Sequence, residues 1–520
     1  MQEQRGWYAR APLICLLVLL CTVVARAIDA RAALQNAASL FEQGKLDEAD
    51  QQARLALSNP QTRPVACSVL GSIRLQQKRL PESARLLQEA IRLEPHLLGA
   101  HLSLAQVYTL QGKPGLALPL YRRVLTLDPS NTAASLALAQ SELEKGHYQK
   151  SLELAKPVLP ALKQSVDGLF LLATDYLKTN DRSAAAALAR DWERLLDVPT
   201  DWSMKFAVLL GQGGVIPEAT DILEGVKQRG SPSYELAFNL AGLYVLKKNF
   251  GRALDSYDQA LTLKPDSLPA LQQAAGIAED REELERALSY WMRAKKIKPT
   301  NPEILFGFGR VCLKMDLLED AETALTQAVN LKPDNPSYQY MLASTKVGKK
   351  QFDAAQDILE GLLKRKPSDP QLHYALGSVL YLQSHLEGAA VHLRESVRLQ
   401  PEQLAPYYYL ALVARDQGRD VEAIQALETL LQRYPDHAPS CEALGSLLMS
   451  ARRYPEAEAS LEKAVRLNPK SVKANYQLGL LLTRMGKKEE ADKRLEIAKA
   501  LRKDDAENSR LQLRLTDPDQ

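Results

Sequence analysis

Large apolar residues recur along this chain with the spacing of helix faces, and the same arrangement returns every 34 residues. Numbered from Ala30, fourteen windows of 34 residues run to Asp505 without an insertion. Within a window, positions 4, 7, 8 and 11 share one face of a first helix, and positions 20, 24 and 27 share one face of a second. Each window is therefore predicted to form an antiparallel pair of helices.

Two positions of the window never hold a large side chain. Position 8 is Ala or Gly and position 20 is Ala or Ser in all fourteen windows, whereas positions 7 and 24 are mostly Leu. Two packed helices lie about 8 to 10 Å apart, which leaves no room for a bulky side chain where they cross. Positions 8 and 20 are therefore predicted to mark the crossing of the two helices in each pair.

Turn residues separate the predicted helices. Between the two helices, position 15 often holds a residue that tolerates positive φ, as a helix C-terminus requires. These residues are Gly44, Gly112, Gly146, Asn180, Gly214, Gly418 and Gly486. A proline closes the second helix at position 32 in most windows. These prolines are Pro95, Pro129, Pro265, Pro299, Pro333, Pro367, Pro401, Pro435 and Pro469. Such a fixed period indicates one helical unit stacked many times.

This pattern resembles the tetratricopeptide repeat, with its Leu-Gly, Ala and Pro landmarks. The match is fullest where Leu376 and Gly377 are followed by Ala389, Leu393 and Pro401. The resemblance implies an all-α fold, a right-handed superhelical solenoid of about fourteen antiparallel helix pairs. We expect a continuous solenoid over residues 28–505 and a C-terminal tail over residues 506–520.

Residues 132–233 depart from the pattern. Position 32 is Lys163, Asp197 and Ser231 in these windows, and Trp192 fills a position that is usually smaller. The 34-residue phase is nevertheless kept on both sides. We therefore predict irregular packing in this segment rather than a domain boundary.

The first 27 residues differ in kind from the repeats. Arg5 and Arg10 precede an uncharged apolar stretch, residues 11–24, and Ala25-Arg26-Ala27 follows it. This order predicts a secretory signal peptide that is cleaved between Ala27 and Ile28. The alternative is a retained membrane anchor, although fourteen apolar residues are fewer than the roughly 20 that cross a bilayer as a helix. The expected location is periplasmic or extracellular.

The charge of the chain argues against nucleic-acid binding. The sequence has 66 Lys and Arg and 63 Asp and Glu. Loss of residues 1–27 removes three of the former and one of the latter, which leaves 63 against 62 and a net charge of about +1. Such a balanced surface lacks the positive charge on which binding to phosphates depends.

No pattern for catalysis, cofactor binding or metal binding is present. Cys67, Cys312 and Cys441 lie in distant windows and are predicted to be buried, unpaired thiols. The seven histidines are scattered, and His385 and His392 lack an Asp, Glu or Cys partner for a metal site. The histidines are predicted to be solvated surface residues, and the protein is predicted not to be an enzyme.

One further feature lies on the first helices. Position 5 is often aromatic, on the side away from the crossing, and we call this set the aromatic ladder. Its members are Phe170, Phe238, Phe306, Tyr340, Tyr374, Tyr408 and Tyr476. The resemblance implies that positions 2, 5, 9 and 12 line a concave, ligand-binding surface. The ladder is then a row of anchors for a partner segment, and the alternative is that its rings fill space between helices.

The sequence thus favours an exported, non-catalytic scaffold that binds protein or peptide partners in the cell envelope. The Lys and Asn pair that grips a C-terminal carboxylate in chaperone-binding tetratricopeptide proteins is absent, since positions 5 and 9 hold Tyr340 with Ser344 and Tyr408 with Leu412. Two alternatives stay open: an accessory protein for polysaccharide export or binding, and a regulatory subunit of a separate enzyme.

Overall fold

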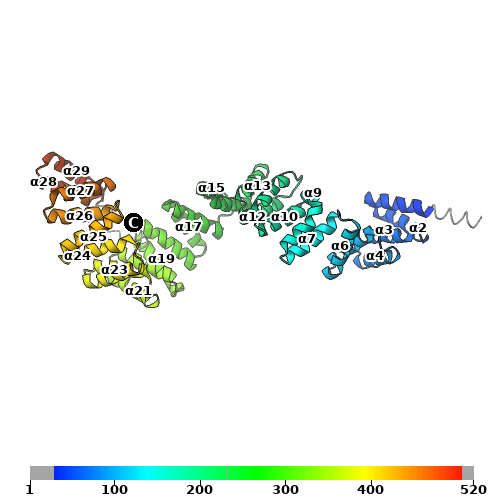
Figure 1. Cartoon of the computed structure of the whole chain (residues 1–520), viewed down its shortest axis with the longest axis horizontal. Coiled ribbons are helices and arrows are strands. Elements are labelled where there is room, and N and C mark those ends of the chain that lie inside the picture. The colour runs from blue at the N-terminus through cyan, green and yellow to red at the C-terminus, as the bar shows by residue number, and fades with distance from the viewer. Residues whose placement is uncertain (1–28, 231, 506–520) are drawn as a thin grey trace, which may run out of the picture. The chain divides into compact units, whose positions relative to one another are not determined.

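The computed structural model describes residues 29–230 and 232–505, and all regular structure in these ranges is helical. Residues 29–42 form the first helix of the first pair (Figure 1). The first helices of the later pairs are α3 (Arg63–Gln76), α5 (Leu98–Leu110), α7 (Thr132–Glu144), α10 (Val166–Lys178), α12 (Thr200–Gln212), α14 (Tyr234–Leu246), α16 (Leu268–Asp280), α18 (Pro302–Lys314), α20 (Pro336–Gly348), α22 (Pro370–Leu382), α24 (Leu404–Asp416), α26 (Ala438–Ser450) and α28 (Val472–Arg484).

Each first helix is followed along the chain by a second helix. The second helices are α2 (Leu46–Ala56), α4 (Leu80–Leu93), α6 (Pro114–Leu127), α8 (Tyr148–Ala155) with η1 (Lys156–Val158) and α9 (Leu159–Leu162), α11 (Arg182–Glu193), α13 (Ile216–Arg229), α15 (Phe250–Leu263), α17 (Leu284–Ile297), α19 (Leu318–Leu331), α21 (Phe352–Arg365), α23 (Leu386–Leu399), α25 (Asp420–Arg433), α27 (Tyr454–Leu467) and α29 (Lys488–Asp505). The predicted all-α fold of about fourteen helix pairs is confirmed.

The predicted helix crossing is confirmed by the space around the position-8 glycines. A Cβ atom built on Gly71, Gly309, Gly377, Gly445 or Gly479 would lie 2.5 to 2.8 Å from the Cγ atom of the leucine at position 24 of the same window. The contact distances of real Cβ atoms are longer than this. In the windows that pair Ala343 with Leu359 and Ala411 with Leu427, a methyl group is accommodated at position 8, so the crossing admits at most alanine there.

The turn between the two helices has the same backbone form in every window. Position 15 has positive φ throughout, including the seven Gly and Asn residues that the sequence indicated. The φ angle is also positive at seven position-15 residues that the sequence did not indicate, namely Lys78, Lys248, Glu282, Asp316, Lys350, Ser384 and Arg452. Two backbone hydrogen bonds close the turn, as in Lys350 N–H to Val347 O at 2.9 Å and Gln351 N–H to Lys346 O at 2.8 Å. This closure holds the left-handed conformation even where the residue is not glycine.

Residues 132–233 contain the interrupted second helix. The helix breaks after α8, continues as the 3₁₀ turn η1 and ends in the four-residue helix α9. Pro157 and Pro160 lie at this break, because a proline lacks the N–H that a helix interior needs. The end of α9 lies directly against α10, since a Cβ atom on Gly168 would be 2.3 Å from the carbonyl oxygen of Leu162.

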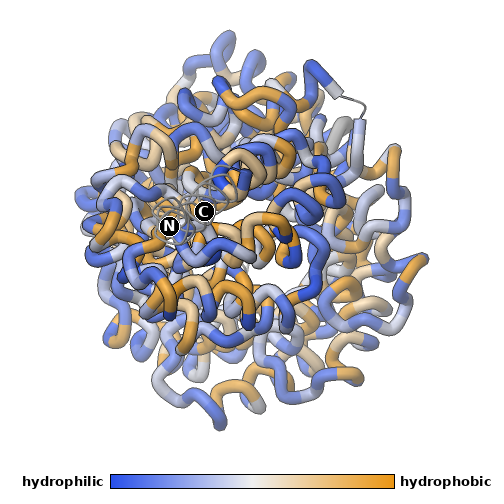
Figure 2. The backbone as a smooth tube through the Cα atoms, turned by 90° about the vertical axis from the view of Figure 1, so that its right-hand side faces the viewer, coloured by the Kyte–Doolittle hydropathy of each residue, from blue (hydrophilic) through white to orange (hydrophobic). Residues whose placement is uncertain are grey.

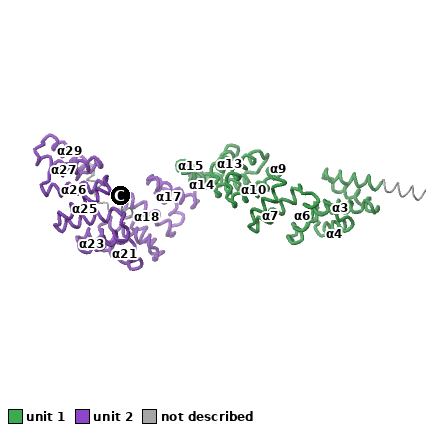
Figure 3. Tube along the Cα trace, in the orientation of Figure 1, with its two compact units in different colours: residues 1–256 green, residues 257–520 purple. Residues whose placement is uncertain are grey.

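The chain divides into two compact units, residues 1–256 and 257–520, with the boundary inside α15 (Figure 3). Hydrophobic and hydrophilic residues alternate along the helices (Figure 2). The predicted signal peptide, its cleavage site at Ala25, Ala27 and Ile28, Ser231 and the predicted C-terminal tail lie outside the described residues.

Candidate functional site

A groove of about 400 Å³ lies in the second unit, beside α18, α20 and α22. Two members of the aromatic ladder, Phe306 and Tyr340, line it. The other lining residues are Arg310, Pro336, Ser337, Met341, Leu362, Lys366, Asp369, Gln371 and Leu372. Ser337 and Gln371 hold position 2 of their windows and Arg310 holds position 9. These are positions that the resemblance assigned to the ligand-binding surface.

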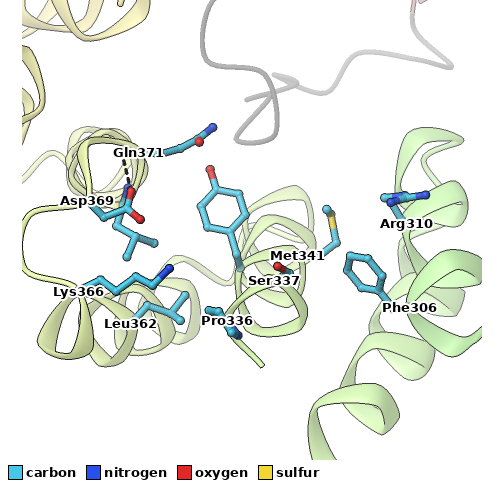
Figure 4. Close-up of a pocket in the computed structure, with 11 residues that line it drawn as sticks. Phe306, Arg310, Pro336, Ser337, Met341, Leu362, Lys366, Asp369 and Gln371 are labelled. Atoms are coloured by element: carbon cyan, nitrogen blue, oxygen red, sulfur yellow. Dashed lines mark hydrogen bonds between the residues drawn. The ribbon is translucent and has the colours of Figure 1, made fainter. Parts of the chain in front are cut away.

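Charged and polar groups stand on two sides of this groove (Figure 4). Phe306 and Arg310 extend from α18, and Lys366, Asp369 and Gln371 lie on the opposite side (Figure 4). The Arg310 guanidinium lies over the Phe306 ring, 5.4 Å from its centroid. Its Nη2 atom donates to Glu279 at 2.6 Å, while its buried Nε atom has no partner among the described residues. The groove thus has an aromatic wall beside a guanidinium that is already ion-paired with the buried Glu279 carboxylate.

The opposite side is fixed by a helix N-terminus. Asp369 caps α22, because its Oδ1 atom accepts hydrogen bonds from the backbone N–H groups of Gln371 at 3.0 Å and Leu372 at 3.2 Å. One oxygen of the Asp369 carboxylate is therefore already used to cap α22. The lining residues carry two cations, Arg310 and Lys366, against this one anion.

The other ladder residues have different surroundings. In the first unit, Phe170 meets Trp192, Trp202 and Phe206 edge to face, with ring centroids 5.4 to 5.7 Å apart. Phe238 is half-buried and stacks on Tyr234. Both side chains pack against neighbouring rings of the same unit.

In the second unit, Tyr374 is buried with 3% of its surface exposed, and its ring meets Tyr409 edge to face. Tyr408 is half-buried between Tyr409 and His437. Burial raises the pKa of Tyr408 well above its usual range. Tyr476 is half exposed. The ladder therefore divides into packed residues, the half-exposed Tyr476, and the groove residues Phe306 and Tyr340, of which Phe306 also stacks on Tyr338 with ring centroids 4.8 Å apart.

The prediction that the histidines are surface residues is wrong for His101 and His373, which are 6% and 8% exposed. Both hold position 4, where the ring Nε2 atom donates to the carbonyl oxygen of the preceding turn proline, Pro95 or Pro367, at 3.0 Å in each case. In another window, the position-4 residue Asn475 makes the equivalent hydrogen bond, because its Nδ2 atom donates to the carbonyl oxygen of Pro469 at 3.0 Å. A polar residue at position 4 was the sequence signal for this contact.

His373 also faces a second imidazole. Its Nδ1 atom lies 3.0 Å from the Nδ1 atom of His392. Because Nε2 of His373 carries the hydrogen that bonds Pro367, its Nδ1 atom accepts and that of His392 donates. Burial and the neighbouring His373 ring lower the pKa of His392.

The three cysteines beyond the predicted signal are buried free thiols, as predicted. Burial raises the pKa of the Cys312 thiol to about 12. Residues 29–230 and 232–505 contain no group of three or more His, Cys, Asp or Glu side chains placed to hold a metal ion. In the same ranges, no helix is both long and apolar enough to cross a bilayer.

The fold and the 34-residue repeat define a helical-repeat protein. Sequence models described as tetratricopeptide repeat match residues 109–173, 280–344 and 448–515, residues 68–132 and 340–403, residues 407–437, and residues 234–267. Together these matches cover well over half of the chain. The chain therefore belongs to the tetratricopeptide-repeat family.

Solved structures of similar fold include the Cut9–Hcn1 hetero-tetramer of APC/C, with 14% identity, a TM-score of 0.40 and coverage of 88% of this chain and 98% of that chain. Yeast Tom70 has 17% identity and a TM-score of 0.36, over 92% of this chain and 97% of that chain. YrrB, described as having an unusual peptide-binding site, has 18% identity and a TM-score of 0.32, over 38% and 97%. These similarities carry no inference about function. A search of curated protein sequences finds no match.

Proposed function

We propose that this protein is an exported, non-catalytic scaffold that binds segments of partner proteins in the groove between Phe306 and Gln371. The observation that supports the proposal most strongly is the composition of this groove. Phe306, Tyr340 and Met341 supply apolar surface, while Arg310, Ser337 and Gln371 supply polar groups at its edge. Binding sites in proteins combine these two features, because apolar contacts supply affinity and polar groups fix orientation.

The charges of the groove favour one kind of segment. Arg310 is ion-paired with Glu279 and Asp369 caps α22, whereas Lys366 has no ion pair among the described residues. A segment that places an apolar side chain beside Phe306 and Tyr340 and a carboxylate beside Lys366 would complement the groove. We therefore expect an apolar and acidic peptide segment rather than a basic one.

A sugar ligand has less support. Carbohydrate rings stack on open aromatic faces, whereas Phe170, Tyr374 and Tyr408 have their rings packed against other rings. The polysaccharide alternative therefore rests on the half-exposed Tyr476 and on the groove residues Phe306 and Tyr340.

The proposed export, and with it a role in the cell envelope, is supported by the signal-peptide pattern of residues 1–27. N-terminal sequencing of the protein purified from its native host should begin at Ile28. Material that begins at Met1 and sediments with membranes would favour a retained anchor and would remove the exported scaffold from the proposal.

Affinity capture tests the groove directly. The mature chain and its Ser337→Trp variant, whose added ring would occupy the groove, are used as baits in envelope extracts, and the captured proteins are identified by mass spectrometry. Gln425→Trp, on an exposed part of α25, is the matched control. The proposal predicts that the wild type and the control capture the same partner and that Ser337→Trp loses it. Equal capture by all three baits would place the binding surface elsewhere.

A further inference from the structure

Position 10 of the window is aliphatic in most windows and charged in one. Val, Ile or Leu fills it in ten windows: Ile73, Val107, Leu209, Leu243, Ile277, Val311, Val379, Val413, Leu447 and Leu481. In the window that begins at Val166, the same position holds Asp175. The three remaining windows hold Ser39, Ser141 and Thr345 at position 10, so Asp175 is the one residue there that can carry a charge.

Asp175 has no hydrogen bond that would compensate for its burial. It is 0% exposed, and neither carboxylate oxygen has a partner among the described residues. Its polar neighbour on α8 is Ser151, whose hydroxyl also lacks a partner by hydrogen-bond geometry. The equivalent residue in another window, Ser83, donates to the carbonyl oxygen of Gly71 at 2.6 Å. An unpaired buried polar group is costly, and an unpaired buried charge is costlier still.

No charged group compensates for the Asp175 carboxylate either. Its α10 helix packs against α7, α8, α9, α11 and α12. On these elements Glu142 and Asp191 are half-buried and hold ion pairs with Lys145 and Lys163 at 2.7 and 3.2 Å. The remaining charged side chains are exposed: Glu144, Lys150, Glu153, Arg182, Arg190, Glu193, Asp201 and Lys205. Burial is accordingly the main influence on Asp175 and raises its pKa to about 6, with the Ser151 hydroxyl opposing it.

The helix that faces Asp175 is also the least regular in the first unit. Other second helices, such as α6 and α13, are continuous over 14 residues, whereas α8 ends after eight. The chain then passes through η1 and the short helix α9. Each break removes helical hydrogen bonds, so this segment has less internal stability with which to resist opening.

We propose that Asp175 makes the packing of α8, η1 and α9 against α10 sensitive to pH. With the carboxyl group protonated, the side chain is neutral and the contact is closed. With it ionised, the closed contact buries an unpaired charge, and opening of the segment gives that charge access to water. Residues 148–178 therefore form a local conformational element whose opening is set by one proton, independently of the groove in the second unit.

The direction and size of the effect follow from the two protonation equilibria. An Asp in water has a pKa near 3.9, and that of Asp175 in the closed contact is about 6. The closed form therefore holds more protons than the open form between these values, and its advantage is greatest at low pH and falls as pH rises through 6. On these values the opening constant increases on the order of tenfold between pH 5 and pH 8.

Hydrogen exchange followed by mass spectrometry on the full mature chain tests the proposal. Opening constants for peptides within residues 148–178 are measured at pH 5 and pH 8 and corrected for the intrinsic pH dependence of exchange. The wild type should show the roughly tenfold increase. Asp175→Asn and Asp175→Leu should show no such increase, and the Leu variant restores the side-chain type of the other windows.

Asp167→Asn is the matched control, because Asp167 is an exposed carboxylate on the same helix. It removes the same charge and should keep the wild-type pH response. A wild type whose opening constant is the same at both pH values would overturn the proposal. So would a pH response that persists in both Asp175 variants.

Discussion

Gly377→Leu is the substitution that most sharply tests the packing rule of the repeat. A Cβ atom at this position would lie 2.8 Å from Leu393 Cγ and 3.2 Å from the carbonyl oxygen of Ala389. The leucine side chain adds three further carbons in a direction that the second helix already occupies. Overpacking of this kind costs about 1 to 3 kcal/mol or more. Because repeat stability is a sum of unit and neighbour terms, the loss should be confined to α22, α23 and the helices beside them.

Native-state hydrogen exchange measures this loss and its location. Protection should fall over residues 370–399 and change little near residue 100, which lies in the other unit. Gly361→Leu is the control, since nothing lies within 4 Å of the position of its Cβ atom, and it should leave stability unchanged or slightly raised. A second variant, Gly377→Ala with Leu393→Ala, should show coupling between the two sites. The packing rule would be refuted if Gly377→Leu behaved like Gly361→Leu, or if protection fell evenly along the chain.

Three further outcomes are expected. Tyr374→Ala should destabilise the second unit by about 3 kcal/mol in urea unfolding, because the ring is buried, whereas Tyr476→Ala should have a much smaller effect; equal losses would contradict the division of the ladder. Burial lowers the pKa of His437 to about 4, so its contribution to stability is present above pH 6.5 and is lost as pH falls towards 4. The urea midpoint should therefore fall from pH 7 to pH 5 less in His437→Gln than in the wild type or in His385→Gln. Iodoacetamide should modify Cys312 much more slowly in the folded chain than in urea at pH 8, since only the thiolate reacts.

The sequence was sufficient to predict the helix pairs because the information that specifies them repeats. Several windows have glycine at position 8 and leucine at position 24, as Gly377 and Leu393 do, and in the structure the two residues of each such pair are in contact. The turn was harder to predict from residue types. Lys350 and Arg452 adopt positive φ because the backbone hydrogen bonds of the turn require it. Glycine at this position makes the turn easier to form but is not necessary for it.

The candidate site could be predicted only in part, because its geometry depends on neighbouring windows. Phe306 and Tyr340 belonged to the predicted ladder, and Arg310 lies at a position assigned to the same surface. Lys366 lies at the C-terminal end of a second helix, and the period alone does not indicate that it lines a groove. Tyr374 has the same residue type and position as Tyr340 but is buried. That difference comes from its contact with Tyr409, a residue that neighbouring windows do not share.

The groove is the central functional claim, and the Phe306→Ala, Tyr340→Ala double variant tests it most directly. Thermal unfolding and capture of the native partner are measured on one preparation, with the Tyr476→Ala variant beside it. The groove residues are half-buried, and truncated aromatic anchors often weaken binding by about 2 kcal/mol or more each. The account predicts lost capture in a double variant that still unfolds cooperatively, with a melting temperature lowered only modestly because both side chains are half-buried and Phe306 stacks on Tyr338. A strongly lowered melting temperature, or a normal melt with undiminished capture, would contradict it.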